Sequence, residues 1–339
     1  MITLPRFRLH RPRSLAEALR ILAEYRGDAR VLAGGTDLLV NLRNRLATPS
    51  HVVALGCLRS LRDIRVADDG GLRVGALATV AELARHAAVN RAFPVLARAA
   101  ASVAGPTIRA MGTVGGNLCL DTRCHWYNQD YFWRKACGFC LKKDGSVCHV
   151  APGSNVCWAV YAGDLAPALL VLDAEAVILS VRGERVVPLN RFFIEDGLRK
   201  YDLAADEILT EVRVAASKAG LGGTYFKLRA RGSVDYPLAG LAAAARIDSE
   251  RRFLGAAAAV TAVGSRPFLI EGASEILDGV EADNVEAIER AAHLAWRLAN
   301  PVKTGGAASP AYRRLRVGLF ARDAFREISA QWPPPESRS

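Results

Sequence analysis

Long hydrophobic runs are missing from this 339-residue chain. Apolar stretches such as residues 165–172 and 238–245 fall well short of the roughly 18 residues that a membrane-spanning helix needs. The N-terminal segment is basic and lacks the continuous apolar core of a secretory signal. We therefore expect a cytoplasmic protein that does not associate with membranes.

Blocks of like charge are missing as well. The net charge is +11, and arginine supplies 38 of the 45 basic residues once the 7 lysines are subtracted. These arginines are scattered, and no basic stripe is interleaved with aromatic residues, so the pattern disfavours a nucleic-acid partner. A phosphate-bearing cofactor or an acidic protein partner suits this charge equally well.

Several nucleotide and catalytic motifs are also missing. The chain has neither a GxGxxG fingerprint nor the lysine of a P-loop, which disfavours the nucleotide folds built on those motifs. Its six histidines lie in unrelated contexts, and no Ser/His/Asp or paired-carboxylate arrangement can be argued. We therefore expect no catalytic acid–base residues in this chain.

The composition is that of an ordinary globular protein, with 51% hydrophobic and 23% charged residues. Capping-box patterns begin expected helices at Ser14 and Thr79, and Asp-Asp-Gly-Gly at 68–71 predicts a hairpin. Three strand-like stretches (224–230, 238–247, 253–263) and two helical ones (283–299, 311–330) predict a C-terminal sheet backed by helices. The expected organisation is two subdomains at 1–57 and 58–220, an insertion at 118–160 within the second, a domain at 221–330, and a disordered tail at 331–339.

Two glycine pairs stand out in the N-terminal two thirds of the chain. Ala-Gly-Gly-Thr-Asp at 33–37 follows an expected strand at 29–33, and Thr-Val-Gly-Gly-Asn occupies 113–117. Glycines there let a phosphate approach backbone N–H groups, although each pair alone is also typical of a tight turn. Together they predict a dinucleotide clamped between two subdomains, with donors from each segment.

Cysteine is the least ordinary part of the composition. Six of the seven cysteines (Cys119, Cys124, Cys137, Cys140, Cys148, Cys157) fall within 39 residues. Because a reducing cytoplasm disfavours disulfides, this crowding indicates a metal centre. Only Cys137 and Cys140 have CxxC spacing, so an iron–sulfur cluster, a structural zinc ion and redox or inert thiols all remain open. His125 and His149 flank cysteines and are expected to be polar neighbours.

Asp164 and Lys227 are single charges in apolar surroundings. A buried charge needs a partner. A flavin could provide one, and so could an ordinary ion pair within the chain.

Four segments together resemble a known family. AGGTDLLV (33–40), TVGGN (113–117), GDLAPALLVLDA (163–174) and YFKLRARGSVDYPLAG (225–240) resemble the FAD-binding medium subunits of the molybdenum hydroxylases, which include xanthine dehydrogenase and carbon monoxide dehydrogenase. The resemblance implies an α+β fold: a two-subdomain FAD-binding module of the PCMH or vanillyl-alcohol-oxidase type, carrying a Cys-rich insertion, followed by a sheet-plus-helices domain as in carbon monoxide dehydrogenase flavoprotein. The flavin contacts that it implies are Val31, Leu32, Ala33, Gly34, Gly35, Thr36, Asp37, Leu38, Gly112, Thr113, Val114, Gly115, Gly116, Asn117, Asp164, Leu209 and Lys227. Position 103, often aromatic in this family, is valine here.

The insertion itself resembles that of the β subunits of the 4-hydroxybenzoyl-CoA reductases, where it holds an additional [4Fe–4S] cluster. The ligands implied by position are Cys124, Cys140, Cys148 and Cys157, which leaves Cys137 unused although its CxxC spacing favours it. The implied function is electron transfer from reduced ferredoxin through the cluster and FAD. On partner subunits, two [2Fe–2S] clusters and a molybdenum cofactor then complete the anaerobic reduction of 4-hydroxybenzoyl-CoA to benzoyl-CoA. The implied assembly holds two copies each of three chains.

Two alternatives belong to other classes. The first is the FAD subunit of a xanthine or carbon monoxide dehydrogenase-like hydroxylase, with a zinc-stapled docking insertion. The second is a zinc-bearing scaffold or nucleic-acid binder without flavin.

Overall fold

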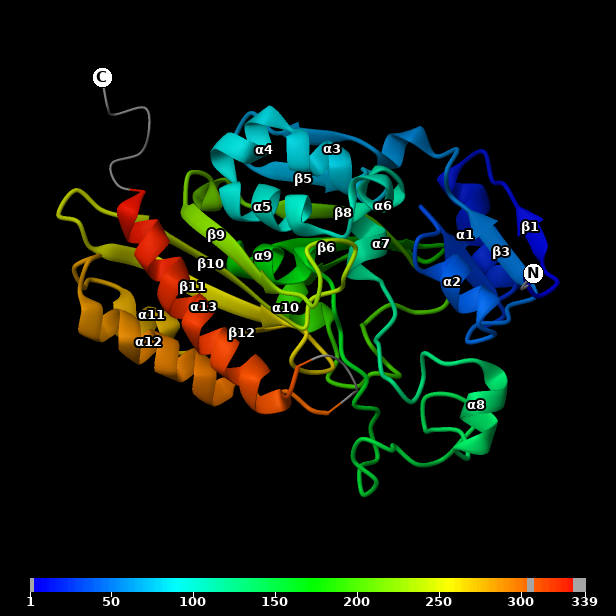
Figure 1. Cartoon of the computed structure of the whole chain (residues 1–339). Helices are drawn as coiled ribbons and strands as arrows, with labels where there is room; N and C mark the ends of the chain where they lie inside the picture. The colour runs from blue at the N-terminus through cyan, green and yellow to red at the C-terminus, as the bar shows by residue number, and fades with distance from the viewer. Residues whose placement is uncertain (1–2, 304–307, 332–339) are drawn as a thin grey trace.

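The computed structural model describes residues 3–303 and 308–331, and its N-terminal part is a small parallel sheet (Figure 1). Strands β1 (Arg8–His10), β2 (Ala29–Leu32) and β3 (His51–Ala54) pair in the order β1-β3-β2. Helix α1 (Leu15–Glu24) turns Ala18, Leu19 and Leu22 into the core, and α2 (Leu38–Arg43) follows the first glycine pair. The expected βαβ-like unit is confirmed.

The two predicted capping boxes differ in outcome. Thr79 and Glu82 form a complete box at α3 (Val80–Arg85). At α1 the Ser14 hydroxyl accepts from the Glu17 backbone, but the Glu17 carboxylate accepts from the N–H of Arg13, at 2.8 Å. The predicted box at Ser14 is therefore incomplete, because the glutamate reaches one residue further back.

A five-stranded antiparallel sheet forms the second layer. Its strands are β4 (Ile64–Val66), β5 (Leu72–Gly75), β6 (Glu175–Ser180), β7 (Gly183–Pro188) and β8 (Ile208–Val214), in the order β4-β5-β8-β6-β7. The hairpin expected across 68–71 joins β4 to β5. The helices of this region are α3, α4 (Ala87–Ala92), α5 (Pro94–Ser102), α6 (Pro106–Met111), α7 (Val114–Leu118), α9 (Leu165–Val171) and α10 (Leu189–Phe192), and short 3₁₀ turns span Arg59–Leu61 and Ala216–Lys218.

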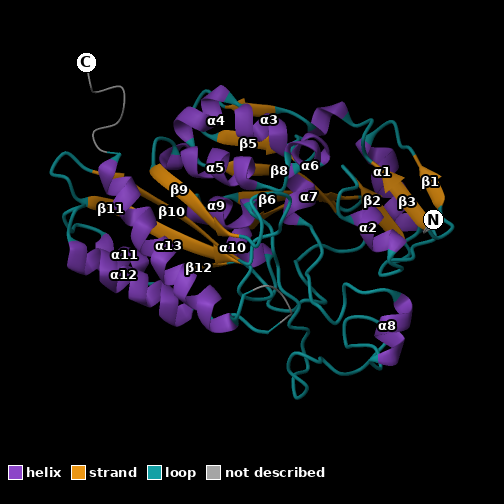
Figure 2. Cartoon of the chain, viewed as in Figure 1, coloured by secondary structure: helices purple, strands orange, loops and turns teal. Residues whose placement is uncertain are grey.

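The C-terminal sheet is buried on both faces. Strands β9 (Gly222–Leu228), β10 (Ala239–Ile247), β11 (Phe253–Thr261) and β12 (Phe268–Leu269) pair in the order β12-β11-β10-β9. Alternate residues of β10 belong to different cores, since Ala242 and Ala244 share one core with residues of α5 and α9, while Leu241 and Ala243 share the other with residues of α12 and α13. Helices α11 (Ala273–Leu277), α12 (Val285–Leu298) and α13 (Pro310–Ala330) lie against the outer face (Figure 2). The expected sheet backed by helices is confirmed.

The Cys-rich insertion projects from the body as a lobe made mostly of loops (Figures 1 and 2). We call residues 123–160 the cysteine lobe. Its one helix is α8 (Tyr131–Ala136), which is capped by the Asp130 carboxylate. Arg123 and Val160 exchange two backbone hydrogen bonds of 2.8 Å and close the neck.

The proposed domain limits stay a prediction, because the fold does not test whether each range is an independent unit. Strand β9 begins at Gly222, next to the expected boundary at 220. Of the tail expected to be disordered, residues 332–339 lie outside the described residues. No helix in the described part of the chain is both long and apolar enough to cross a bilayer.

Candidate functional site

The two glycine-bearing segments pack directly against each other. A Cβ atom on Gly34 would lie 1.8 Å from the carbonyl oxygen of Met111, at the end of α6. Gly35 has a φ of +76°, in the left-handed region that glycine favours. Only glycine therefore permits this approach at position 34, and it brings the segment after β2 against the one before α7.

The backbone N–H groups of the two segments are used differently. Within the described structure, no hydrogen bond is donated by the amides of residues 34–38. The amides of Val114 and Gly115 donate to the carbonyls of Ala78 and Ala76, at 2.9 Å each. The amide of Gly116 donates to the Thr113 hydroxyl that caps α7. The prediction that both segments offer open N–H donors is therefore wrong for residues 114–117 of the second, which form a short helix whose amides are all hydrogen-bonded.

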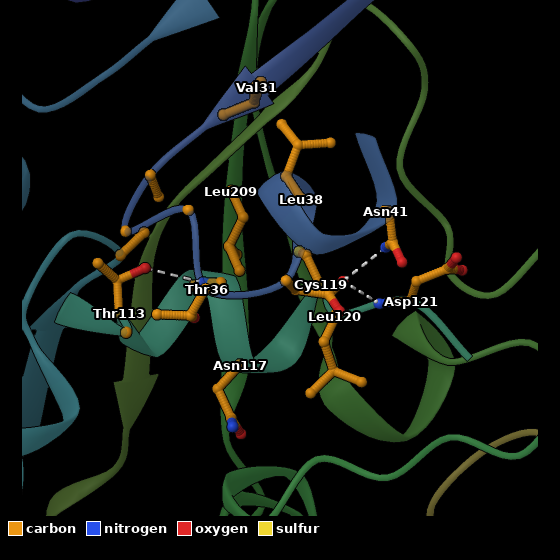
Figure 3. Close-up of a pocket in the computed structure, with 18 of the residues that line it drawn as sticks. Val31, Thr36, Leu38, Asn41, Thr113, Asn117, Cys119, Leu120, Asp121 and Leu209 are labelled. Carbon is orange, nitrogen blue, oxygen red and sulfur yellow. Dashed lines mark hydrogen bonds between the residues drawn. The ribbon is translucent and has the colours of Figure 1, made fainter. Parts of the chain in front are cut away.

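Both segments line a cavity of about 720 Å³, which we call the main cavity (Figure 3). Figure 3 shows Val31 on β2, Leu38 and Asn41 on α2, Asn117 on α7 and Leu209 on β8 around it. Of the predicted flavin contacts, the structure brings together Val31, Ala33, Gly34, Gly35, Thr36, Asp37, Leu38, Gly112, Thr113, Gly115, Gly116, Asn117, Asp164 and Leu209. Leu32, Val114 and Lys227 are not among the lining residues.

Asp164 and Lys227 are partners in the structure. The Lys227 ammonium lies 3.0 Å from one Asp164 oxygen, and the Tyr225 hydroxyl donates to the other at 2.8 Å. Burial raises the pKa of Asp164 against the opposing effect of the ammonium. The ion pair left open from the sequence is thus present, and only Asp164 of the two faces the main cavity.

A charged group that no sequence motif indicates also lines the main cavity. Asp121 accepts from Lys200 at 2.8 Å and from Lys142 at 2.9 Å. Its own N–H donates to Asp37 at 2.9 Å (Figure 3). Burial would raise the pKa of Asp121, but the two ammonium groups outweigh it and hold that pKa well below its usual range. No local pattern joins residues 79 positions apart, so sequence spacing offered no signal for this contact.

The cysteines differ in burial and in the cavity that they line. Cys124, Cys140, Cys148 and Cys157 are each 5–9% exposed and line one small cavity, which we call the cysteine cavity. Cys137 is half-buried, Cys57 is exposed, and Cys119 lines the main cavity instead. These four side chains are the set that the resemblance implied, and Cys137 of the CxxC pair is not among them.

Three ring-bearing side chains of the lobe lie beside the four thiols. Trp126, Tyr127 and His149 line the cysteine cavity, and the His149 ring is hydrogen-bonded to the Phe139 carbonyl. Burial raises the thiol pKa of Cys124 to about 12 and that of Cys157 to about 11. Among residues 3–303 and 308–331, no three or more His, Cys, Asp or Glu side chains are arranged to hold a metal ion. The ligand set therefore stays a prediction.

Comparisons with known proteins agree on the family. Residues 5–216 match the family described as FAD binding domain in molybdopterin dehydrogenase, and residues 224–328 match the CO dehydrogenase flavoprotein C-terminal domain. The xanthine dehydrogenase FAD-binding subunit of Escherichia coli O157:H7 is 33% identical over 71% of this chain and 68% of its own length. The carbon monoxide dehydrogenase medium chain of Hydrogenophaga pseudoflava is 29% identical over 97% of this chain and 98% of its own.

Solved structures show the same architecture over nearly the whole chain. A chain of the Cu,Mo-CO dehydrogenase, in its cyanide-inactivated form, superimposes with a TM-score of 0.79 at 26% identity, covering 97% of this chain and 100% of that one. A chain of quinoline 2-oxidoreductase from Pseudomonas putida 86 gives a TM-score of 0.75 at 25% identity, covering 97% and 98%. The chain therefore belongs to the FAD-binding medium subunits of the molybdenum hydroxylases, as an α+β FAD-binding domain followed by a CO dehydrogenase flavoprotein C-terminal domain, and it is an electron-transfer subunit of a molybdenum-containing oxidoreductase.

Proposed function

We propose that this chain holds FAD in the main cavity and a [4Fe–4S] cluster in the cysteine cavity, and that electrons pass between the two. The observation that carries the proposal is the sorting of the thiols. Four of seven are buried around one cavity of an otherwise loop-built lobe, and the other three are not. Three of these thiols also pack with apolar neighbours such as Leu46 and Ala159, and the burial of all four around one cavity is what a shared metal centre requires of its ligands.

The main cavity suits a dinucleotide. The unpaired N–H groups of residues 34–37 precede α2, where a pyrophosphate can be bound by backbone donors. Val103 and Leu209 offer apolar surface within the same cavity, and Asp164 offers a carboxylate for a hydroxyl or ring edge. Bound FAD supplies a centre that accepts and releases electrons, and the protein's part is to bind and orient it.

The cysteine cavity suits a cluster better than a single ion. Tetrahedral zinc at about 2.3 Å from each sulfur requires thiolates packed closely around one point. In a cluster four irons separate the thiolates, so ligands with long and irregular spacing along the sequence suit a cluster. Cys124, Cys140, Cys148 and Cys157 are the proposed ligands.

The further assignment, to 4-hydroxybenzoyl-CoA reductase, is supported by the insertion's resemblance. A ferredoxin delivers single low-potential electrons, and an iron–sulfur centre in a projecting lobe suits that delivery. We propose that such a ferredoxin is the donor. Electrons then leave through FAD toward two [2Fe–2S] clusters and the molybdenum cofactor on a small and a large partner subunit, two copies of each chain forming the complex.

The second candidate is the FAD subunit of a hydroxylase of the xanthine or carbon monoxide dehydrogenase type, with zinc in the lobe. The relatives favour it, since several of those that match are described as xanthine or carbon monoxide dehydrogenase subunits. This candidate predicts flavin without iron and rapid flavin reduction by NADH. The reductase predicts flavin with iron and reduction by ferredoxin.

Substitution of one buried and one half-buried cysteine tests the cluster. Cys148→Ser should remove most of the bound iron from the anaerobically purified protein and leave the FAD content unchanged, because the two cavities have separate linings. Cys137→Ser is the matched control from the same lobe and should retain the iron. Equal iron content in Cys148→Ser and wild type would contradict the ligand set.

A further inference from the structure

Lys142 is a buried charge that joins the two cavities. Its side chain is 5% exposed and lines the cysteine cavity, two residues after Cys140. Its ammonium donates to Oδ1 of Asp121 at 2.9 Å and to the Thr122 carbonyl at 2.8 Å. Asp121 lines the main cavity. One lysine of the lobe is thus tied to the wall of the neighbouring cavity.

The Asp121 carboxylate also accepts hydrogen bonds from two other residues. Oδ1 of Asp121 also accepts from Lys200 at 2.8 Å, and Oδ2 accepts from the Tyr127 hydroxyl at 2.9 Å. We call Lys142, Asp121 and Lys200 the charge bridge. Its carboxylate stands between two ammonium groups, and Lys200 itself lines the main cavity.

We propose that the charge bridge positions the cysteine lobe on the main cavity and sets the electrostatic potential at the flavin. This inference rests on the part of the proposed function that places FAD in the main cavity, and it needs no iron. Lys142 and Asp121 act as positioning residues, since neither is a proposed ligand of the flavin or of the metal.

The arrangement makes the two single substitutions unequal. Asp121→Asn leaves the ammonium groups of Lys142 and Lys200 facing each other without a counter-charge, which is costly in a buried site. Lys142→Met leaves Asp121 still paired with Lys200. The lobe should therefore loosen more in Asp121→Asn than in Lys142→Met, and the double variant should recover part of the loss.

Hydrogen–deuterium exchange tests the positioning. We expect exchange across residues 124–157 to be at least tenfold faster in Asp121→Asn than in wild type. In the double variant, Asp121→Asn with Lys142→Met, exchange should be slower than in Asp121→Asn alone. Lys143→Met is the control, because this neighbouring lysine pairs with Asp144 and does not touch the bridge. Wild-type exchange in both bridge variants, or equal acceleration in the control, would overturn the proposal.

The midpoint potential of the bound flavin tests the electrostatic part. Lys142→Met removes a positive charge and should shift the potential to more negative values, whereas Asp121→Asn removes a negative charge and should shift it to more positive values. Loosening of the lobe alone would move both in the same direction, so shifts of equal sign, or none, overturn the proposal. If Asp121→Asn does not fold, the sign of the potential shift in Lys142→Met, compared with Lys143→Met, tests the proposal on its own. A preparation with flavin and no iron would refute the proposed cluster. The midpoint potential of its flavin would still test the charge bridge.

Discussion

At the scale of single residues, the first glycine pair is where sequence and structure agree most closely. Glycine is required at Gly34 because the carbonyl of Met111 leaves no room for a Cβ atom, and it is favoured at Gly35 because φ is positive there. The second pair looks equivalent in sequence, but its amides are paired to Ala76, Ala78 and Thr113. Whether an amide is open depends on which distant strand or turn lies beside it, and a motif does not carry that information.

Gly34→Ala should therefore be damaging. The new Cβ would overlap a backbone carbonyl that no side-chain rotation can relieve, so we expect a loss of about 1–3 kcal/mol in the free energy of unfolding. FAD binding should weaken at least tenfold, since the segment that carries the open amides must move. Chemical denaturation and flavin titration measure the two effects.

Gly56→Ala is the control for that substitution. An added Cβ there meets nothing within 4 Å, and its φ is not in the left-handed region. Wild-type stability and flavin affinity in Gly34→Ala would show that the close approach of the two segments is not needed.

At the scale of elements, residues before β8 are held by an arginine of β7. The Arg185 guanidinium donates to both oxygens of Glu207, at 2.8 and 2.9 Å, and to Asp202 at 2.9 Å. The hydrogen bonds from Arg185 lower the pKa of Glu207 despite opposing burial. Because the folded pKa lies below the unfolded value of about 4.3, this stabilisation is complete above that pH and is lost as the pH falls through the folded pKa.

Arg185→Met should thus cost stability in a pH-dependent way. We expect a loss of about 1 kcal/mol at pH 7, a modest figure because the arginine is partly exposed, and a smaller difference from wild type below about pH 4. Urea unfolding at several pH values measures it, with the exposed Arg191→Met as control. A difference that stays constant from pH 7 to pH 3 would contradict the ion-pair account.

Helix α8 is one of the elements that were not predicted from the sequence, and it carries the most exposed aromatic ring in the part of the chain that the structure describes. Phe132 is 81% exposed on the lobe that holds the proposed cluster. We expect Phe132→Ala to slow reduction by ferredoxin about tenfold while leaving iron and flavin content unchanged, since exposed aromatic anchors often dominate docking. Leu315→Ala, at an exposed position on α13, should have no effect. Stopped-flow reduction with both variants separates docking from a general loss of function.

At the scale of the whole molecule, most of the architecture could be predicted. The strands and helices of the C-terminal sheet follow from regular periodicity, and the four relevant thiols from the resemblance. The charge bridge could not, because Asp121, Lys142 and Lys200 meet only after the lobe folds back on the main cavity. The lobe has little apolar periodicity, so its shape depends on such long-range polar contacts and on whatever the four cysteines bind.

The joint presence of iron and flavin tests the central claim most directly. The protein, produced with its partner chains and purified without oxygen, should contain about one FAD and about four irons per copy of this chain, and no stoichiometric zinc. Zinc in place of iron, or a preparation with flavin and no metal, would contradict it.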